Sequence, residues 1–145
     1  MAFSTRAMRA ADWSEIQNFK PIEFRNPERM GYEFMKWLDE LRTRCKVPMI
    51  ITSSYRSPAY NKSVGGAPDS SHTDAICDAV DVGMRPRTDD PNWNYSRFQI
   101  SMTARDMGCE RIGLYSNGSL HLDRTENKRA APRMWVVVSG HPNPS

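Results

Sequence analysis

The sequence predicts an α+β domain with a mainly antiparallel sheet and helices packed against it. Part of the chain repeats apolar residues at spacings of three and four, which is typical of an amphipathic helix. Other short stretches are apolar or alternate apolar with polar residues, which is typical of strands. The elements follow the order helix, strand, long loop, strand, helix and then three strands, which favours an antiparallel arrangement.

The first helix is expected after an irregular start. Residues 1–25 show only a short helical turn around 11–19. Asn26 and Pro27 then form a helix start, with asparagine as the N-cap and proline at the first helical position. An apolar stripe predicts that the helix covers residues 27–45. The members of the stripe are Met30, Phe34, Leu38, Leu41 and Cys45.

A buried strand over 48–52 is expected next, followed by a functional loop. Residues 54–71 are rich in Ser, Gly, Pro, Asn and Tyr, and long loops in compact domains commonly carry function. Residues 79–83 predict a second short strand.

The C-terminal half is expected to hold one helix and three strands. Asp90 and Pro91 repeat the pattern of N-cap and proline, and they predict a helix that runs to about Met107 and stops at Gly108. The strand candidates cover residues 111–115, 119–124 and 134–139. Asn117-Gly118 is a hairpin turn signal between the first two.

The bulk composition fits one globular domain. A chain of 145 residues suits a single core, and 39% hydrophobic with 26% charged residues excludes a disordered protein. The net charge of +3 comes from scattered basic residues, which argues against a nucleic-acid partner. No stretch reaches the length of a membrane span, and residues 1–13 lack the apolar run of a secretory signal. Three cysteines cannot all pair, which predicts free thiols in a reducing compartment.

Two short segments carry most of the side chains suited to chemistry. Ser70-Ser71-His72 is followed nine residues later by Asp81, and Leu120-His121-Leu122-Asp123 adds a second imidazole and carboxylate. Such a set suits a catalytic zinc site, which uses three protein ligands and leaves a fourth position for water. Strand alternation places His121 and Asp123 on one face and the two leucines towards the core. The second segment alone also fits a solvent-facing pair on a half-buried sheet.

Further motifs surround these segments in a fixed order: Ser54-Tyr55-Arg56-Ser57-Pro58-Ala59-Tyr60-Asn61, Val64-Gly65-Gly66-Ala67, Ser70-Ser71-His72, Ala79-Val80-Asp81-Val82, His121-Leu122-Asp123 and Trp135. This order resembles the zinc D-alanyl-D-alanine carboxypeptidases and L-alanyl-D-glutamate endopeptidases of bacteria and their phages, which share a fold with the hedgehog signalling domain. The resemblance covers about residues 20–138 and implies a single zinc peptidase domain over 1–145, with an extension at 1–19 and a tail at 139–145. Several motifs in one order are more specific than any single one.

The resemblance implies a zinc site and a substrate site. His72, Asp81 and His121 are the implied zinc ligands. Zinc in such a site lowers the pKa of a bound water and polarises the scissile carbonyl. Arg56 is implied to bind a substrate carboxylate or carbonyl oxygen, for which its planar fork is suited. Ser70 is implied to hydrogen-bond the peptide.

One departure from the family pattern concerns the third ligand. The family usually places its aspartate seven residues after the first histidine, with a glycine between them. Here Asp81 lies nine residues on, and position 75 is alanine. Asp78, six residues after His72, and the thiol of Cys77 are therefore rival ligands. Asp81 is preferred, because Ala79-Val80-Asp81-Val82 resembles the family's strand pattern and a bulge can absorb the two extra residues.

A second departure concerns the general base. Many members carry a carboxylate three residues before the second histidine, where this chain has Gly118. Asp123 is the best substitute as catalytic base, because it shares a strand face with His121. It equally suits a carboxylate that orients a ligand imidazole. Tyr55, Tyr60 and Tyr115 are candidates for lining a substrate groove, although turn and core positions suit them as well.

The leading hypothesis is a zinc metallopeptidase that hydrolyses peptidoglycan stem peptides or cross-links, with Arg56 also stabilising the oxyanion. Its expected partner is the peptidoglycan peptide, without nucleic acid or membrane. A phage lysis enzyme that waits in the cytoplasm before release to the wall fits this hypothesis, and so does a virion component that contacts other virion proteins. The alternatives are a non-catalytic virion structural or binding protein on the same fold and a dipeptidase for D-Ala-D-Ala.

Overall fold

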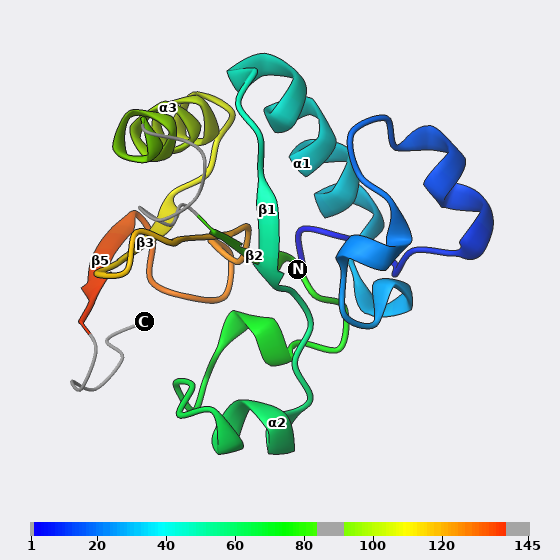
Figure 1. Cartoon of the computed structure of the whole chain (residues 1–145). Helices are drawn as coiled ribbons and strands as arrows, with labels where there is room; N and C mark the ends of the chain where they lie inside the picture. Colours follow the sequence, from blue (N-terminus) through cyan, green and yellow to red (C-terminus); the bar gives the residue numbers. More distant parts are fainter. Residues whose placement is uncertain (1, 84–91, 139–145) are drawn as a thin grey trace.

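The computed structural model describes residues 2–83 and 92–138. In this part the chain forms a five-stranded sheet with helices on both sides (Figure 1). The strands are β1 (Ile50–Ser53), β2 (Ala79–Gly83), β3 (Arg111–Tyr115), β4 (Leu120–Asp123) and β5 (Arg133–Val137), and the helices are α1 (Tyr32–Cys45), α2 (Pro58–Ser63) and α3 (Trp93–Asp106). The strand order is β1-β2-β4-β3-β5, and only the pairing of β3 with β5 is parallel. The predicted α+β class is confirmed.

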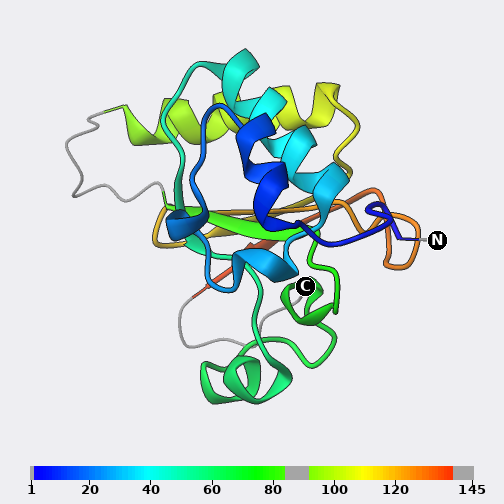
Figure 2. The ribbon, with the colours of Figure 1, turned by 90° about the vertical axis from the view of Figure 1, so that its right-hand side faces the viewer.

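The sheet separates an apolar layer from a polar one. Successive side chains of a strand point to opposite faces. On one face, apolar side chains pack beneath α1 and α3, which lie together on this side of the sheet (Figure 2). They include Val80, Val82, Ile112, Leu120 and Leu122, all of them buried. The other face carries α2 and the 3-10 turn η4 (Ser71–Thr73), which packs against β2.

Helix α1 begins later than the sequence predicts. A helix was expected over 27–45, but Pro27–Arg29 forms a separate 3-10 turn and α1 starts at Tyr32. Asn26 has a left-handed φ of 52° and makes no cap with its side chain. The chain between the turn and the helix bridges to other segments, with the Gly31 amide donating to the Cys77 carbonyl at 2.8 Å. These long-range hydrogen bonds hold the backbone before Tyr32 in an extended conformation, so α1 begins only at Tyr32.

The N-terminal segment belongs to the same folded unit. Its 3-10 turn Ala10–Glu15 matches the predicted helical turn in part. Met8 and Ile16 are buried in the main core. The Ser4 hydroxyl accepts a hydrogen bond of 3.0 Å from the Phe34 amide and so caps α1 from a distant part of the chain.

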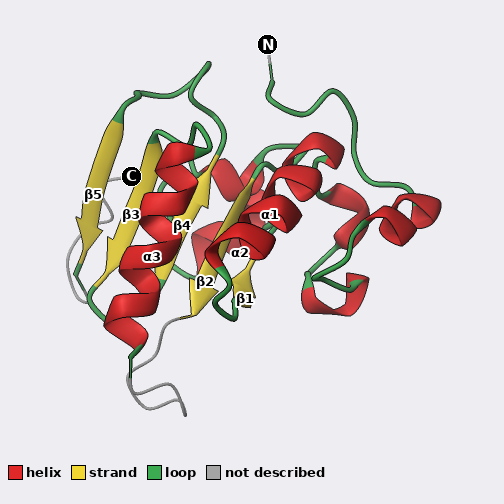
Figure 3. Cartoon of the chain, turned by 90° about the horizontal axis from the view of Figure 1, so that it is seen from above, coloured by secondary structure: helices red, strands yellow, loops and turns green. Residues whose placement is uncertain are grey.

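Other elements differ from expectation in ways that shape the site. The predicted strand over 48–52 is confirmed as β1, but β1 is an edge strand with Ile50 49% exposed, so the prediction that it is buried is wrong. Helix α2 lies inside the predicted loop 54–71 and is capped by Ser57, whose hydroxyl accepts from the Tyr60 amide. Strand β5 crosses to pair in parallel with β3 rather than continuing an antiparallel run (Figure 3).

The second helix is confirmed at its end only. Helix α3 stops at Asp106, and Gly108 has a φ of 94°, as expected for a glycine stop. Its predicted start at Asp90-Pro91 lies outside the described residues. The expected free thiols are confirmed for Cys45, Cys77 and Cys109, which are all buried. Within residues 2–83 and 92–138, no helix has both the length and the apolar character required to cross a membrane.

Candidate metal centre

One residue from each strand forms a row across the polar face of the sheet. The paired positions are Ser53, Asp81, His121, Gly113 and Trp135, in that order from β1 to β5. The Trp135 ring reaches over Gly113 to the His121 ring, with 5.3 Å between centroids. A Cβ at Gly113 would lie 2.7 Å from the indole, so the absence of a side chain there permits the contact.

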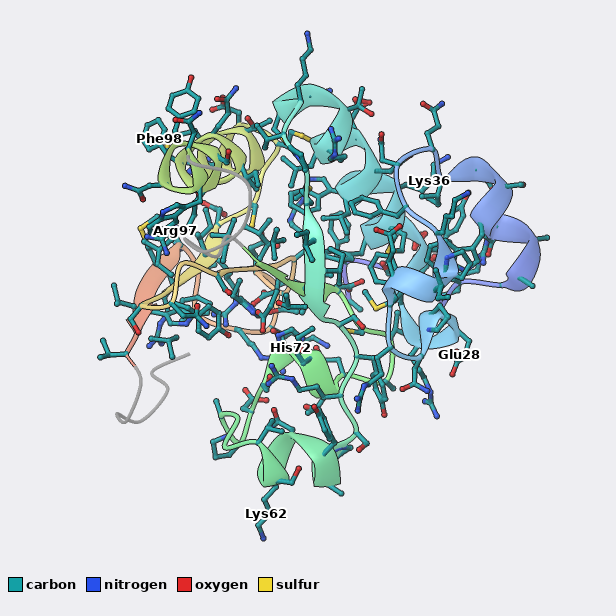
Figure 4. All side chains as sticks on the ribbon, viewed as in Figure 1. Glu28, Lys36, Lys62, His72, Arg97 and Phe98 are labelled. Atoms are coloured by element: carbon teal, nitrogen blue, oxygen red, sulfur yellow. The ribbon has the colours of Figure 1, made fainter. Side chains whose placement is uncertain are left out.

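His72 joins this row from the turn η4. Its Nε2 lies 3.2 Å from Asp81 Oδ1, and His121 Nδ1 lies 3.0 Å from the same oxygen. All three residues are buried, and their ligand atoms lie within 4.8 Å of one another. Figure 4 shows His72 between the sheet and the α2 segment. The structure therefore brings together the three zinc ligands that the resemblance implies.

The protein holds the second nitrogen of each imidazole. His72 Nδ1 donates to the Ser54 carbonyl oxygen at 2.6 Å, and His121 Nε2 lies 2.7 Å from Asp123 Oδ2. His72 Nε2 and His121 Nδ1 are thereby turned towards Asp81. A ligand histidine in a metal site typically bonds a carbonyl or carboxylate through its other nitrogen. Two imidazoles and a carboxylate arranged in this way fit a zinc ion.

Asp123 lies behind His121 with both of its oxygens engaged. Arg111 Nε and Thr125 Oγ1 donate to Oδ1 at 2.9 and 2.6 Å. Ser71 Oγ donates to Oδ2 at 3.1 Å. Asp123 is fully buried and does not line the cleft described below. Of the two roles that the sequence leaves open, these contacts favour orienting His121, while the role of catalytic base stays a prediction.

The cluster holds positive charge between two carboxylates. Burial lowers the pKa of His121, but hydrogen bonds with Asp123 and Asp81 outweigh it and raise the pKa to about 9. Burial raises the pKa of Asp81, but the charge on His72 and hydrogen bonds from His121 and His72 outweigh it and hold that pKa well below its ordinary value. A cation is therefore favoured at this point, either a proton on His121 or a metal ion.

Asp81 connects the cluster to a cleft of about 360 Å³, because it is the member of the cluster that lines this cleft. Arg56 lines the cleft and donates to Ser53 Oγ, Asn61 Oδ1 and Asp81 Oδ2 at 2.9, 3.2 and 3.3 Å. The Tyr115 hydroxyl donates to Asp81 at 3.3 Å from the same cleft. The remaining lining residues are Thr52, Tyr60, Val64, Asn117 and Ser119. Two of the three candidate tyrosines, Tyr60 and Tyr115, thus line this cleft.

The rival ligands lie outside the cluster. Asp78 Oδ2 accepts from the Ser4 amide at 3.2 Å. The Cys77 thiol donates to the Ala79 carbonyl at 3.4 Å, and burial raises its pKa far above the ordinary value, which disfavours a thiolate ligand. Strand β2 pairs regularly with β4 from Ala79 onwards, so the extra residues are accommodated before the strand.

Ser70 supports His72 instead of facing the cleft. Its hydroxyl accepts from the His72 amide at 3.2 Å and caps η4. Ser70 is buried and is not among the residues that line the cleft. Its implied hydrogen bond to the peptide stays a prediction.

Several partners of the site were not among the sequence candidates. Ser54 acts through its backbone carbonyl, which no side-chain pattern reveals. Ser71 and Thr125 are short hydroxyl residues without a distinctive spacing. Arg111 could have been found from the sequence, because strand alternation places it on the same strand face as Gly113 and Tyr115. A buried arginine on that face requires a carboxylate partner, which is Asp123.

The comparisons with known proteins agree with this geometry. A family model described as Peptidase M15 matches residues 15–123. The matched range includes the three clustered residues and Asp123, and it ends before Trp135. No curated protein matches the chain.

Proposed function

Because the chain belongs to the peptidase M15 family and is a metallopeptidase with a His-Asp-His cluster, we propose that it hydrolyses peptide bonds in the stem peptides or cross-links of peptidoglycan, with zinc as its cofactor. The observation that carries the proposal is the convergence of His72, Asp81 and His121 in one cluster, of which Asp81 lines a polar cleft. A cleft with a few convergent polar groups is the usual form of an active site.

The side chains around the cluster have separable roles in this proposal. Zinc bound there would supply a water of lowered pKa and would polarise the scissile carbonyl. The Ser54 carbonyl and the Asp123 carboxylate orient the two imidazoles. Arg56 and Tyr115 present donors at the cleft, where hydrogen bonds to a carbonyl oxygen stabilise its developing negative charge.

The setting of the reaction is also part of the proposal. Peptidoglycan is the proposed partner, reached during phage lysis after accumulation in the cytoplasm, or through a virion that carries the enzyme. The choice between D,D-carboxypeptidase and endopeptidase activity belongs to the same proposal. The motif order that resembles phage and bacterial wall peptidases supports these points.

Mass spectrometry of muropeptides tests the function. Zinc-loaded wild type, His72→Ala and a control, Lys36→Ala, are incubated with purified cell walls at neutral pH. Lys36 lies on the exposed surface of α1, paired with Glu15. We expect new fragments and one bound zinc per chain with the wild type and the control, and neither with His72→Ala. A native, zinc-holding wild type that leaves the walls uncut would contradict the proposal, and a metal-free native protein would favour the non-catalytic alternative.

A further inference from the structure

A second arginine lies beside the cleft and has no role in the chemistry above. Arg25 is exposed and belongs to the N-terminal segment, between the 3-10 turns Pro21–Glu23 and Pro27–Arg29. It lines a pocket of about 80 Å³. That pocket shares Thr52, Ser53, Arg56 and Tyr60 with the larger cleft, so the two hollows are neighbours. Arg25 and Asp81 of the metal cluster therefore line two neighbouring hollows of the same surface.

The structure holds Arg25 in place without neutralising it. Its backbone amide donates to Ser54 Oγ at 2.9 Å, and the same hydroxyl donates back to its carbonyl oxygen at 3.1 Å. Its guanidinium carbon lies 4.2 Å from the centroid of the Tyr60 ring. Among residues 2–83 and 92–138, no ion pair joins Arg25 to a carboxylate.

Arg56 differs from Arg25 in this respect. The three guanidinium nitrogens of Arg56 all donate to protein oxygens, one of them to Asp81. Its charge is therefore already opposed by a carboxylate of the cluster. No carboxylate among the described residues opposes the charge of Arg25 in this way. Its side chain lies at the small polar pocket beside the cleft. A planar guanidinium of this kind is suited to bind a carboxylate through two parallel hydrogen bonds.

We propose that Arg25 is a specificity-determining residue that binds a free carboxylate of the substrate, so the enzyme prefers acidic peptides to their carboxamide forms. This inference rests on the proposed peptidase function. The carboxylate belongs either to an internal acidic residue or to the C-terminus of the peptide. Both sources share the chemistry that Arg25 recognises.

Matched peptides separate the two sources. A synthetic tetrapeptide stem is prepared with all carboxylates free, with the internal carboxylates amidated, and with only the C-terminal carboxylate amidated. Each is offered to zinc-loaded wild type, Arg25→Gln, Arg25→Lys and Arg29→Gln. Arg29 is the matched control, because it is an exposed arginine of the same segment that stacks on a tyrosine, Tyr55, but lines neither hollow. The dissociation constant is measured by calorimetry, and KM and kcat by product analysis.

We expect one of the two amidations to weaken binding to the wild type by about fivefold, the value of a partly exposed ion pair. Arg25→Gln should weaken binding of the acidic peptide by the same factor and abolish the preference, with kcat and zinc content unchanged. Arg25→Lys should retain part of the preference, and Arg29→Gln all of it.

Two results would overturn the inference: equal wild-type affinity for all three peptides, or a preference that survives in Arg25→Gln. The calorimetric measurement needs no turnover. A wild type that binds with an Arg25-dependent preference but cuts no peptide would refute the proposed function and leave the carboxylate site standing.

Discussion

At the scale of single residues, the two carboxylates of the site have different tasks. Asp81 presents an oxygen to both imidazoles, whereas Asp123 touches only the outer nitrogen of His121. Arg111 neutralises Asp123 inside the protein, so the carboxylate stays charged without contact with solvent. Burial raises the pKa of Asp123, but the hydrogen bond and charge of His121 outweigh it and hold that pKa well below the ordinary value.

Asp123→Asn distinguishes the two roles that the sequence leaves open. If Asp123 orients His121, the variant should bind zinc about 10- to 100-fold more weakly, because partners of ligand histidines contribute that much to metal affinity. Competition with a chelating dye measures this, with circular dichroism as the check on folding. Asp69→Asn is the control, since the Asp69 side chain is 88% exposed. Unchanged zinc affinity with lost activity would instead identify Asp123 as the catalytic base.

Tyr115 is the residue on which the proposed stabilisation of the carbonyl oxygen depends most directly. Its hydroxyl reaches Asp81 from the cleft, and phenylalanine would keep the ring while removing the donor. Tyr115→Phe should lower kcat about tenfold, the value of one hydrogen bond, with KM and zinc affinity nearly unchanged. Steady-state kinetics and zinc titration check this. A variant with wild-type kcat would remove Tyr115 from the mechanism.

At the scale of elements, the parallel pairing of β5 with β3 completes the environment of His121. The pairing places Trp135 opposite Gly113, and the indole extends over the glycine to the imidazole. Arg111 also lies 5.0 Å from the Trp135 ring centroid, so the same indole packs against the partner of Asp123. An edge strand thus contributes one wall of the metal centre.

Gly113→Ala tests this contact. The new methyl group would displace the indole, and overpacking of a buried site costs about 1 to 3 kcal/mol in the free energy of unfolding. Urea denaturation measures the loss. Because the close atoms belong to the far part of the indole, the double variant Gly113→Ala/Trp135→Phe should recover part of it. Additive losses in the double variant would show that the two residues do not compete for this space.

At the scale of the whole molecule, the buried Asp78 links the N-terminal segment to the sheet. Its Oδ2 accepts from the Ser4 amide, while its Oδ1 is buried without a hydrogen-bond partner among the described residues. Burial raises the pKa of Asp78 from 3.8 to about 6. The folded protein therefore holds this proton more tightly than the unfolded chain does, and it loses stability as the pH rises from about 4 to about 6.

Asp78→Asn should remove this pH-dependent loss. At pH 7.5 the variant should be more stable than the wild type by about 2 to 3 kcal/mol, since each pKa unit corresponds to about 1.4 kcal/mol. The difference should disappear below about pH 4, where Asp78 is protonated in both states. Thermal and urea unfolding at both pH values check the sign. A variant less stable than the wild type at pH 7.5 would show that the charge of Asp78 stabilises the fold.

The sequence predicts the local features of this fold better than the long-range ones. Strand alternation correctly placed His121 and Asp123 on one face, and the glycine stop of α3 was correct. The late start of α1 depends on a bridge to Cys77, and the direction of β5 depends on its pairing with β3, so neither is encoded within its own segment. The same dependence on long-range contacts limits what the sequence reveals about the site. Motifs identify the three clustered residues, but Ser54 and Arg111 gain their roles only through contacts with residues distant in the sequence.

Ser54 connects two binding events. Its carbonyl oxygen accepts a hydrogen bond from His72 Nδ1, and its hydroxyl forms hydrogen bonds with the backbone of Arg25. If zinc binding shifts His72, the same residue transmits the shift to the proposed carboxylate site. Thermodynamic linkage then requires reciprocity, so that an acidic peptide tightens zinc binding by the factor by which zinc tightens the peptide. The N-terminal segment would in this way report the state of the metal centre to the substrate.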